Sequence, residues 1–425
     1  MFRKVLVANR GEIALRIMRT CTRLGIATVA VYSDADRDAL HVRRADEAVR
    51  IGPARASASY LDISAIVDAA RRAGADAVHP GYGFLSENPV LPEACAAAGI
   101  VFVGPSAAAM RLLGDKSAAR RLAAEHGVPV LPGFDAVAPD GRALIEAAAS
   151  IGFPLMVKAA AGGGGRGMRL VPSSGELPAA LAGARRETEA AFGDGRLLIE
   201  RAVVGGRQVE GQGRADAHAH AVHLGERDCS VQRRHQKVVE ESPAPGIDRA
   251  LRERLSAAAL TVAQAADYVN AGTVEFLLDR DAGFYFLEVN TRLQVEHPVT
   301  EMVTGLDMVE LQLRIAAGEA LPFGQADVRS TGHAIECRVY AEDPERGYMP
   351  SSGRVTYFLP PQGDGVRVDS GIETGSVVPA EYDPLLAKVI VHAASRAEAI
   401  ERCAQALDAC AVEGVKTNLG LLQAV

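Results

Sequence analysis

The stretch that decides the central fold runs from Thr273 to Glu296 and reads TVEFLLDRDAGFYFLEVNTRLQVE. Two apolar runs flank the segment 279–283, which ends in glycine. Apolar runs on either side of a short glycine-containing turn predict two adjacent strands. The sequence therefore predicts a strand–turn–strand unit, and the polar residues inside it call for an explanation.

After the turn, polar and apolar residues alternate. Successive side chains of a strand point to opposite faces, so one face would carry a polar stripe. The stripe consists of Glu288, Asn290, Arg292, Gln294 and Glu296. Alternation alone also fits a half-exposed strand with a solvated polar face.

The strand before the turn places one carboxylate, Glu275, inside an apolar run. Burying a carboxylate is costly unless it is paired or bound to a metal. Carboxylate and amide oxygens suit magnesium, so Glu275, Glu288 and Asn290 are candidate metal ligands. Arg292 could orient an anion and Glu296 could act as a base.

Bulk composition limits the kind of protein. The chain has 425 residues, which suggests roughly two to four domains. Hydrophobic residues make up 48% and charged residues 23%, as in globular proteins. No run approaches the ~18 apolar residues of a membrane span, and Met1 to Val7 is interpreted as a first strand rather than a signal peptide.

Charge and cysteine usage narrow the choice further. The net charge of −7 argues against nucleic acid as the main partner. The six cysteines are scattered and form no Cys-x-x-Cys pair, so neither a zinc site nor a disulfide framework is predicted. A cytoplasmic location fits this pattern best.

The first part of the chain alternates short apolar runs with helical patterns. Strands are expected at Val5–Ala8, Thr28–Tyr32 and Ile100–Val103, and a helix at Ile63–Ala73. This alternation predicts a parallel α/β sheet with right-handed crossovers. The first strand leads into Asn9–Glu12 rather than a Gly-x-Gly-x-x-Gly turn, so dinucleotide binding is poorly supported.

A glycine-rich loop occupies Ala159–Gly167, between predicted strands Leu155–Lys158 and Met168–Val171. Glycines let backbone N–H groups approach phosphates closely, and Lys158 is a candidate phosphate ligand. The loop is not a Walker motif. Strands on both sides favour a flap over a triphosphate, and a flexible linker is the alternative.

Two further segments carry candidate ligands. The basic run Arg227–Lys237 offers His235 and Lys237 to phosphate or carbonate, although a solvated basic loop has the same composition. Cys229 within it is either a reactive thiol or a packed one. Tyr82 follows a predicted strand end, where open α/β sheets bind ligands. From about Gly332 onward the chain turns to short strands, with one expected at Arg354–Phe358.

Taken together, seven strings resemble the biotin carboxylase family, a branch of the ATP-grasp enzymes. The strings are Ala8–Ala14, His79–Asn88, Gly114–Lys116, the glycine loop, Glu226–Glu241, Glu288–Glu301, and Glu336–Arg338 with Ala341–Pro344. They follow the family order over nearly the whole chain, which makes the match very specific.

The resemblance implies an α/β and α+β multidomain fold in three parts. A Rossmann-like domain would span residues 1–114 and an ATP-grasp domain residues 115–331, with a mobile glycine-rich lid at about 131–203. A β-rich C-terminal domain would span residues 332–425. The implied reaction is the ATP- and bicarbonate-dependent carboxylation of biotin through carboxyphosphate.

The resemblance also assigns residues. Implied ATP contacts are Lys116, Lys158, Gly164, Gly165, Glu200, Arg201, Val203, Gln208, His235, Glu275 and Glu288. The implied ligands of Mg²⁺ or Mn²⁺ are Glu275, Glu288 and Asn290. Bicarbonate would contact Lys237, Arg292 and Val295, and biotin would contact Tyr82 and Arg338. The implied catalytic residues are Arg292, Glu296, Lys237 and Arg338.

Some positions depart from the family pattern. Gln208 replaces a histidine, Arg201 replaces a common lysine, and Ala161 replaces a loop glycine. Gly211 and Gly213 are expected to weaken their strand. The family also usually continues beyond Val425, where part of the adenine wall lies. These departures concern nucleotide affinity rather than the class of reaction.

The expected partners are separate chains. No Met-Lys-Met biotinyl segment occurs, so a biotin carboxyl carrier protein and a carboxyltransferase subunit are expected, with a homodimer as the family's usual state. The reaction would be the first half of an acetyl-CoA or other acyl-CoA carboxylase, as in fatty acid biosynthesis. The alternatives are a catalytically impaired scaffold, motivated by Gln208 and Gly211, and another ATP-grasp ligase, against which Tyr82 and Arg338 speak.

Overall fold

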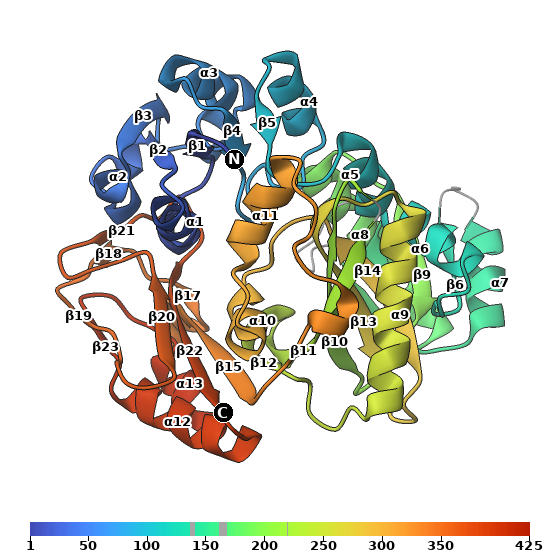
Figure 1. The fold of residues 1–425 in the computed structure, drawn as a ribbon. Coiled ribbons are helices and arrows are strands. Elements are labelled where there is room, and N and C mark those ends of the chain that lie inside the picture. The colour runs from blue at the N-terminus through green and yellow to red at the C-terminus, as the bar shows by residue number, and fades with distance from the viewer. Residues whose placement is uncertain (137–140, 161–167, 219) are drawn as a thin grey trace.

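The structure is a computed structural model that describes residues 1–136, 141–160, 168–218 and 220–425. The chain forms three main bodies: an N-terminal parallel sheet, a long antiparallel sheet that includes the strand of the polar stripe, and a small separate sheet (Figure 1).

The N-terminal body is a five-stranded sheet in the order β3-β2-β1-β4-β5, and its strand pairs are parallel. Its strands are β1 (Lys4–Val7), β2 (Ala27–Ser33), β3 (Glu47–Gly52), β4 (Ala77–His79) and β5 (Val101–Phe102). Its helices are α1 (Gly11–Arg23), α2 (Leu40–Arg44), α3 (Ile63–Ala73), α4 (Val90–Ala97) and α5 (Ala107–Gly114). The predicted parallel α/β sheet is confirmed.

Helix α3 shows how local sequence sets an element. The Asp62 side chain accepts a hydrogen bond from the Ala65 backbone N–H, which caps the first turn. Gly74 ends the helix with φ +64°, a conformation that glycine adopts without strain. Ile66 and Val67 lie on the buried side, toward the sheet. The predicted range of this helix, Ile63–Ala73, is confirmed residue for residue.

The central body is an eight-stranded antiparallel sheet in the order β14-β13-β10-β11-β12-β15-β22-β20. Its strands are β10 (Arg207–Ala215), β11 (Ala221–Arg233), β12 (Gln236–Ser242), β13 (Asn270–Leu278), β14 (Phe284–Asn290), β15 (His333–Tyr340), β20 (Val366–Ser370) and β22 (Leu385–Ala393). The hydrogen-bonded pair of β12 and β15 joins the middle of the chain to its C-terminal part.

Helices cover both faces of this sheet. They are α6 (Lys116–Glu125), α9 (Arg249–Ala265), α10 (His297–Thr304), α11 (Met308–Ala316), α12 (Arg396–Asp408) and α13 (Leu419–Ala424). Helix α9 packs with Phe276 and Phe284 of the β13–β14 hairpin in the largest apolar core. Figure 1 shows α9 on the outer side of this hairpin, while α10 and α11 lie toward the N-terminal body.

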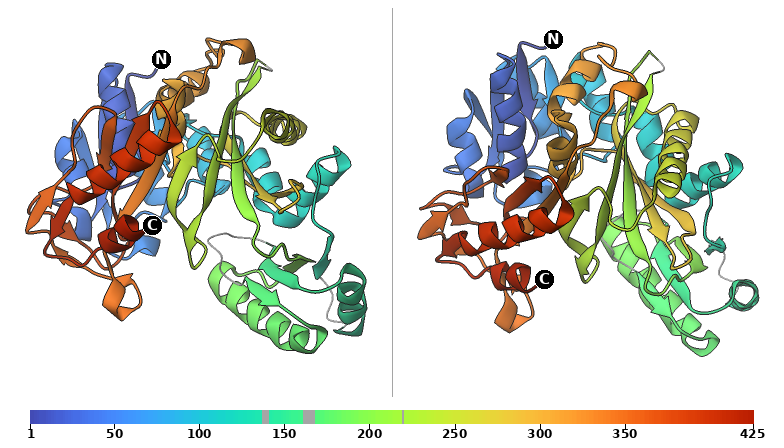
Figure 2. Two further views of the ribbon diagram at one scale, coloured as in Figure 1. Left: turned by 90° about the horizontal axis from the view of Figure 1, so that it is seen from below. Right: turned by 60° about the horizontal axis from the view of Figure 1, so that its bottom comes forward.

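The small sheet stands apart from the rest of the molecule (Figure 2, left). Its order is β6-β9-β7-β8, from Gly133–Ala136, Leu197–Arg201, Leu155–Ala159 and Arg169–Val171, with helices α7 (Gly141–Ile151) and α8 (Leu177–Phe192). It has a hydrophobic core of its own, built around Leu155, Val157 and Ile199. The unit runs from residue 133 to residue 201, and residues 161–167 of the glycine loop lie outside the described residues. The lid at about 131–203 stays a prediction.

One local expectation is wrong. The predicted single strand Arg354–Phe358 is two short strands, β18 (Gly353–Arg354) and β19 (Tyr357–Leu359), which pair with different partners. The glycines at 211 and 213, which were expected to weaken their strand, leave β10 paired with β13 along its whole length, but the register with β11 shifts between them. A Cβ at Gly211 would approach the Ala259 Cβ to 3.1 Å, so the missing side chain lets α9 lie close against the strand.

Candidate active site

A row of four charged residues crosses the central sheet. The register places Arg227 opposite Glu210, Glu210 opposite Glu275, and Glu275 opposite Glu288, on β11, β10, β13 and β14. Residues directly opposite in a sheet point to the same face, so the four side chains gather on one surface. Arg227 and Glu210 are fully buried, with 0% exposure, and their side chains form an ion pair of 2.5 Å.

Lys237 on β12 contacts three carboxylates at this surface. Its ammonium lies 2.6 Å from a Glu210 oxygen, 2.9 Å from a Glu275 oxygen and 2.5 Å from a Glu296 oxygen. Burial alone would lower the pKa of this amine, but the surrounding anionic groups outweigh it and raise the pKa well above its usual value. Lys237 is therefore charged, and it holds three carboxylates together.

Glu296 stands at the N-cap position of α10. It contacts Lys237 on one side, and on the other side Arg338 donates an Nη2–H to its second oxygen at 2.9 Å. Burial would raise the pKa of Glu296, but Lys237, Arg338 and Arg227 lower it well below its usual value. The resting state of this residue is a carboxylate, as a base requires.

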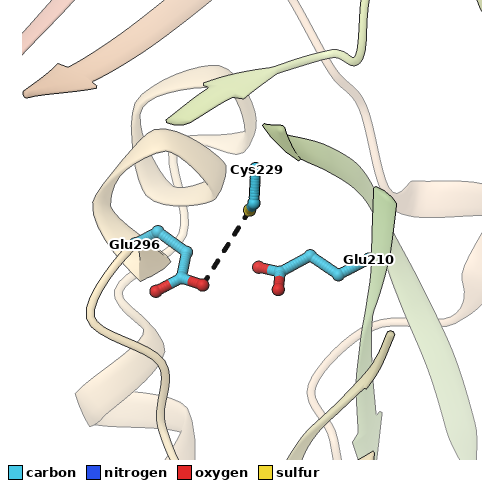
Figure 3. Close-up of side chains that lie close together, drawn as sticks. All are labelled: Glu210, Cys229 and Glu296. Atoms are coloured by element: carbon cyan, nitrogen blue, oxygen red, sulfur yellow. Dashed lines mark hydrogen bonds between the residues drawn. The ribbon is translucent and has the colours of Figure 1, made fainter. Parts of the chain in front are cut away.

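Glu210, Cys229 and Glu296 converge from three directions (Figure 3). Their ligand atoms lie within 4.8 Å of one another, a spacing that a cation could fill. The Lys237 ammonium already contacts both carboxylates, so the positive charge that this cluster needs is present. Burial raises the pKa of Cys229 well above its usual value, so it is a packed thiol rather than a reactive thiolate.

The three predicted metal ligands lie together on the β13–β14 hairpin. Asn290 donates to a Glu275 oxygen at 2.8 Å, and Glu275 lies opposite Glu288 in the sheet. Burial raises the pKa of Glu275 to about 7, although the Lys237 charge opposes this shift. Two carboxylates and an amide oxygen fit a hard divalent cation, which would supply the positive charge that favours an ionised Glu275.

Basic residues lie near this hairpin. Lys116, at the start of α6, forms an ion pair with Glu288, and the pKa of that carboxyl is lowered because the charges of Lys116, Lys158 and Lys237 outweigh burial. Lys158 on β7 forms an ion pair of 2.5 Å with Glu200 on β9. The structure thus brings Lys116 to the predicted metal ligands, while Lys158 and Glu200 lie in the small sheet.

Gln208 occupies a connecting position. It donates to Glu275 and accepts a hydrogen bond of 2.5 Å from Gln232. The neutral side chain therefore has partners in the site. The other adenine-side candidates are peripheral: Arg201 is exposed at the end of β9, Val203 follows it, and His235 is exposed in the turn between β11 and β12. Gly164 and Gly165 lie outside the described residues.

Arg292 and Gln294 reach the site from the segment after β14. Arg292 donates to the Gln294 side-chain oxygen and to the Asn290 side-chain oxygen, both at 3.0 Å. Gln294 is 3.4 Å from Glu275 through its amide nitrogen. The expectation that the chain stays extended to Glu296 is wrong, because β14 ends at Asn290 and α10 starts at His297. The polar stripe converges through a turn instead.

Val295 contributes its backbone. Its carbonyl oxygen accepts a hydrogen bond of 2.9 Å from the Lys388 ammonium on β22. On the same side, Tyr82 donates its hydroxyl to Glu12, and Lys388 lies 3.3 Å from Glu12. Of the two predicted biotin positions, Arg338 contacts Glu296 directly, whereas Tyr82 is linked to the Val295 carbonyl through Glu12 and Lys388.

Six residues of the site were not singled out from the sequence. They are Glu12, Glu87, Glu210, Arg227, Glu240 and Lys388. Glu210 and Arg227 could have been found from the sequence. Each is a charged residue inside a strand, and the same argument selected Glu275. Glu87 bonds Arg292 at 3.2 Å across 205 positions of sequence, a contact that no local pattern predicts.

The fold and the site define an ATP-dependent ligase. Residues 115–323 match the ATP-binding domain of the carbamoyl-phosphate synthase L chain. Residues 1–110 match the biotin carboxylase N-terminal domain and residues 336–425 the biotin carboxylase C-terminal domain. The chain belongs to the biotin carboxylase family.

Individual relatives agree with this assignment. A biotin carboxylase of Halalkalibacterium halodurans is 52% identical over 100% of this chain and 94% of its own length. The structure of a Campylobacter jejuni biotin carboxylase complex superposes with a TM-score of 0.97, at 46% identity, covering 100% of this chain and 95% of that one.

A third comparison bears on ligands. The biotin carboxylase domain dimer of Hydrogenobacter thermophilus 2-oxoglutarate carboxylase, solved with MgADP, ADP and bicarbonate, has a TM-score of 0.96 and 44% identity, covering 100% of this chain and 93% of that one. The protein described here carries out biotin carboxylation, the first half-reaction of the biotin-dependent carboxylases. In the described part of the chain, no helix has the length and apolar character of a membrane span.

Proposed function

We propose that this chain carboxylates biotin on a separate biotin carboxyl carrier protein, using bicarbonate and MgATP, through carboxyphosphate. The observation that carries the proposal is the cluster of Lys237, Glu296 and Arg338, with contacts of 2.5 and 2.9 Å on the two oxygens of Glu296. A buried carboxylate between two cations is ionised, and it stands beside groups that can hold an anionic substrate.

Bicarbonate binding is assigned to Lys237, Arg292 and the Val295 backbone. Bicarbonate is an anion and a weak nucleophile, so the two cations hold it while Glu296 removes its proton. Protonation of Glu296 removes one anion from beside Lys237 and Arg338, which keep Glu210, Glu275 and Glu240 as partners. The positive charge freed in this way favours the carboxyphosphate dianion that forms, with ADP as the leaving group, when bicarbonate attacks the γ-phosphate.

The nucleotide is assigned to Lys116, Lys158, Glu200, Arg201, Val203, Gln208 and His235, with Gly164 and Gly165 of the loop outside the described residues. Lys116 stands beside the metal ligands Glu275, Glu288 and Asn290. Mg²⁺ or Mn²⁺ at these oxygens would neutralise the phosphate charge. Closure of the small sheet over the triphosphate would keep water from carboxyphosphate.

The biotin side is assigned to Tyr82 and Arg338. Carboxyphosphate releases carbon dioxide and phosphate, and the phosphate takes the proton from the ureido nitrogen. The Arg338 guanidinium stabilises the negative charge left on the ureido oxygen while the nitrogen attacks carbon dioxide. We further propose a homodimer in the cytoplasm that works with a carboxyltransferase subunit in an acetyl-CoA or other acyl-CoA carboxylase of fatty acid biosynthesis. The dimeric relative and the near full-length match to a biotin carboxylase support this assembly.

The test is bicarbonate-dependent ATP cleavage with and without free biotin. The parent chain should cleave ATP faster with biotin, and EDTA should abolish the activity until Mg²⁺ or Mn²⁺ is restored. Glu296→Ala should lower the biotin-dependent rate by at least about 100-fold, a general-base contribution. The exposed Glu253→Gln on α9 is the matched control and should keep the parental rate.

Several outcomes would contradict the proposal. ATP cleavage that ignores bicarbonate and biotin would identify another ATP-grasp ligase, and the absence of any cleavage by a folded chain would identify a scaffold. Unchanged activity of Glu296→Ala would remove the base from its role. Transfer of label from [¹⁴C]bicarbonate to a biotinylated carrier protein would test the carrier directly.

A further inference from the structure

One face of the C-terminal half of the central sheet carries four buried charges. In the register, Glu240 on β12 lies opposite Glu336 on β15, and Arg338 on β15 lies opposite Lys388 on β22. Glu336 and Arg338 are two positions apart on one strand, so all four share a face. Glu240, Glu336 and Lys388 have 0% exposure.

Helix α10 closes this face. Its residues Val299 and Val303 pack with Ala334 and Ile390, which flank the charged residues on β15 and β22. The helix begins next to Glu296, so the proposed base and the four charges share one buried layer. Charges in such a layer need partners, because water does not reach them.

Arg338 finds its partners on both sides. Its Nε–H donates to a Glu240 oxygen at 2.6 Å, and its Nη2 lies 2.5 Å from the same oxygen. The same Nη2 donates to Glu296 at 2.9 Å. Lys388 is occupied elsewhere, by the Val295 carbonyl at 2.9 Å and by Glu12 at 3.3 Å. The guanidinium therefore spans from Glu240 to Glu296.

Glu336 is the surplus group. Neither of its oxygens has a hydrogen-bond partner among the described residues, and the second oxygen of Glu240 has none either. The cations near Glu336 are Lys388 and Arg338, and Glu240 has Arg338. These two cations are already bonded to Glu240, Glu296 and Glu12. A fourth carboxylate without a cation of its own would be very costly here, so Glu336 holds a proton.

The structure assigns to Glu240 the positioning of Arg338, and to Glu336 a protonated carboxyl that shares its hydrogen with the unbonded oxygen of Glu240, so that the pair carries one negative charge. This inference rests on the proposed function only in taking Arg338 as the biotin-side cation. Burial, assisted by Glu240 and Glu296, raises the pKa of Glu336 well above its usual value. Burial raises the pKa of Glu240 to about 7, against the lowering effect of Arg338.

The charge of the Glu240–Glu336 pair decides where the Arg338 guanidinium lies. With one negative charge, the pair holds Arg338 at a fixed place beside Glu296, ready for the ureido oxygen. A second proton on the pair would release Arg338 from Glu240. Loss of the shared proton would add an anion that competes with Glu296 for the same guanidinium. The single proton is therefore part of the geometry of the biotin side.

The experiment compares Glu240→Gln, Glu336→Gln and the exposed control Glu345→Gln. For each, ATP cleavage is measured with bicarbonate, with and without free biotin. Glu240→Gln should raise the KM for biotin at least about tenfold, while the KM for bicarbonate changes much less. Glu336→Gln keeps a neutral side chain, so its KM for biotin should rise at least threefold less than that of Glu240→Gln. The control should match the parent.

Infrared spectroscopy at pH 8 gives a readout independent of activity. The parent should show the C=O band of a buried carboxylic acid, Glu336→Gln should lose it, and Glu240→Gln should shift it. The inference is overturned if Glu336→Gln leaves the band intact, if both glutamine variants raise the KM for biotin equally, or if Glu240→Gln leaves it unchanged. Should Glu240→Gln fail to fold, the band in Glu336→Gln decides.

Failure of the proposed function would look different. In that case the parent itself would show no biotin-stimulated ATP cleavage, while the infrared band would still report the state of Glu336. A parent that responds to biotin but shows no band lost in Glu336→Gln would retain the proposed function and refute the proton-sharing pair.

Discussion

The buried guanidinium of Arg227 offers the sharpest test of what holds the site together. It is fully buried and donates to Glu210 at 2.5 Å, to Gln212 and Thr300 at 2.9 Å, and to Thr273 at 3.3 Å. Arg227→Met removes these bonds while filling similar space. Glu210 then keeps Lys237 as its only close cation among the described residues.

Breaking a buried ion pair by removing one partner costs about 3–5 kcal/mol. At about 2.1 cal/mol/K of unfolding entropy per residue, a loss of about 4 kcal/mol over this chain corresponds to a Tm lower by roughly 4–5 °C. Differential scanning calorimetry measures it. Arg249→Met is the matched control, because its pair with Glu253 is exposed and should shift Tm by less than about 1 °C.

A double-mutant cycle makes the reasoning refutable. Glu210→Gln alone removes one anionic partner from two buried cations, Arg227 and Lys237. In the double variant Arg227→Met with Glu210→Gln, only Lys237 has lost a partner. The double variant should therefore lose at least about 1 kcal/mol less than the sum of the single losses. Additive losses, or a Tm for Arg227→Met within about 1 °C of the parent, would show that this pair does not stabilise the row of charges.

Three further predictions concern stability and accessibility. Burial lowers the pKa of the His41 imidazole to about 4. The unfolded chain therefore binds this proton more tightly, and the free energy of unfolding falls between about pH 6.5 and 4. In urea titrations over that window His41→Gln should lose on the order of 3 kcal/mol less than the parent, and equal pH slopes would contradict this. The pKa of Asp307 is lowered because Arg16, Thr20 and backbone N–H groups outweigh burial. The contribution of the Asp307 carboxylate to stability is therefore present above about pH 4 and lost below it. The difference in unfolding free energy between the parent and Asp307→Asn should shrink as the pH falls, and a constant difference would contradict this prediction. All six cysteines are buried, so a thiol reagent should react slowly with the folded chain and with six thiols after denaturation; rapid labelling of Cys229 would disprove its assignment as a packed thiol.

Much of the fold was predictable where local chemistry is strong. Helix α3 follows from its apolar period, the Asp62 cap and Gly74. The β13–β14 hairpin follows from two apolar runs around a glycine turn. Strand β3 (Glu47–Gly52) was missed because half of it is exposed at the edge of the sheet and charged residues interrupt its short apolar pattern.

The site was predicted in its residues more than in its geometry. Alternation correctly brought Glu288 and Asn290 to one face, but a bulge beside Glu275 and the end of β14 at Asn290 break the period after that point. The chain turns into α10 because Pro298 suits a first helical turn, a signal that alternation concealed. The contact between Glu240 and Arg338 spans 98 positions, a separation that no local pattern can bridge.

The sheet that runs from β14 to β20 crosses the boundary between two of the matched family domains. The family matches stop at residue 323 and resume at 336, yet β12 and β15 are hydrogen-bonded neighbours on either side of that interval. The hydrogen-bond register between β12 and β15 therefore sets the distance between Glu240 and Arg338. A chimera that took its last third from a relative would have to inherit the register as well as the residues, because a slip of one position would turn Arg338 to the opposite face.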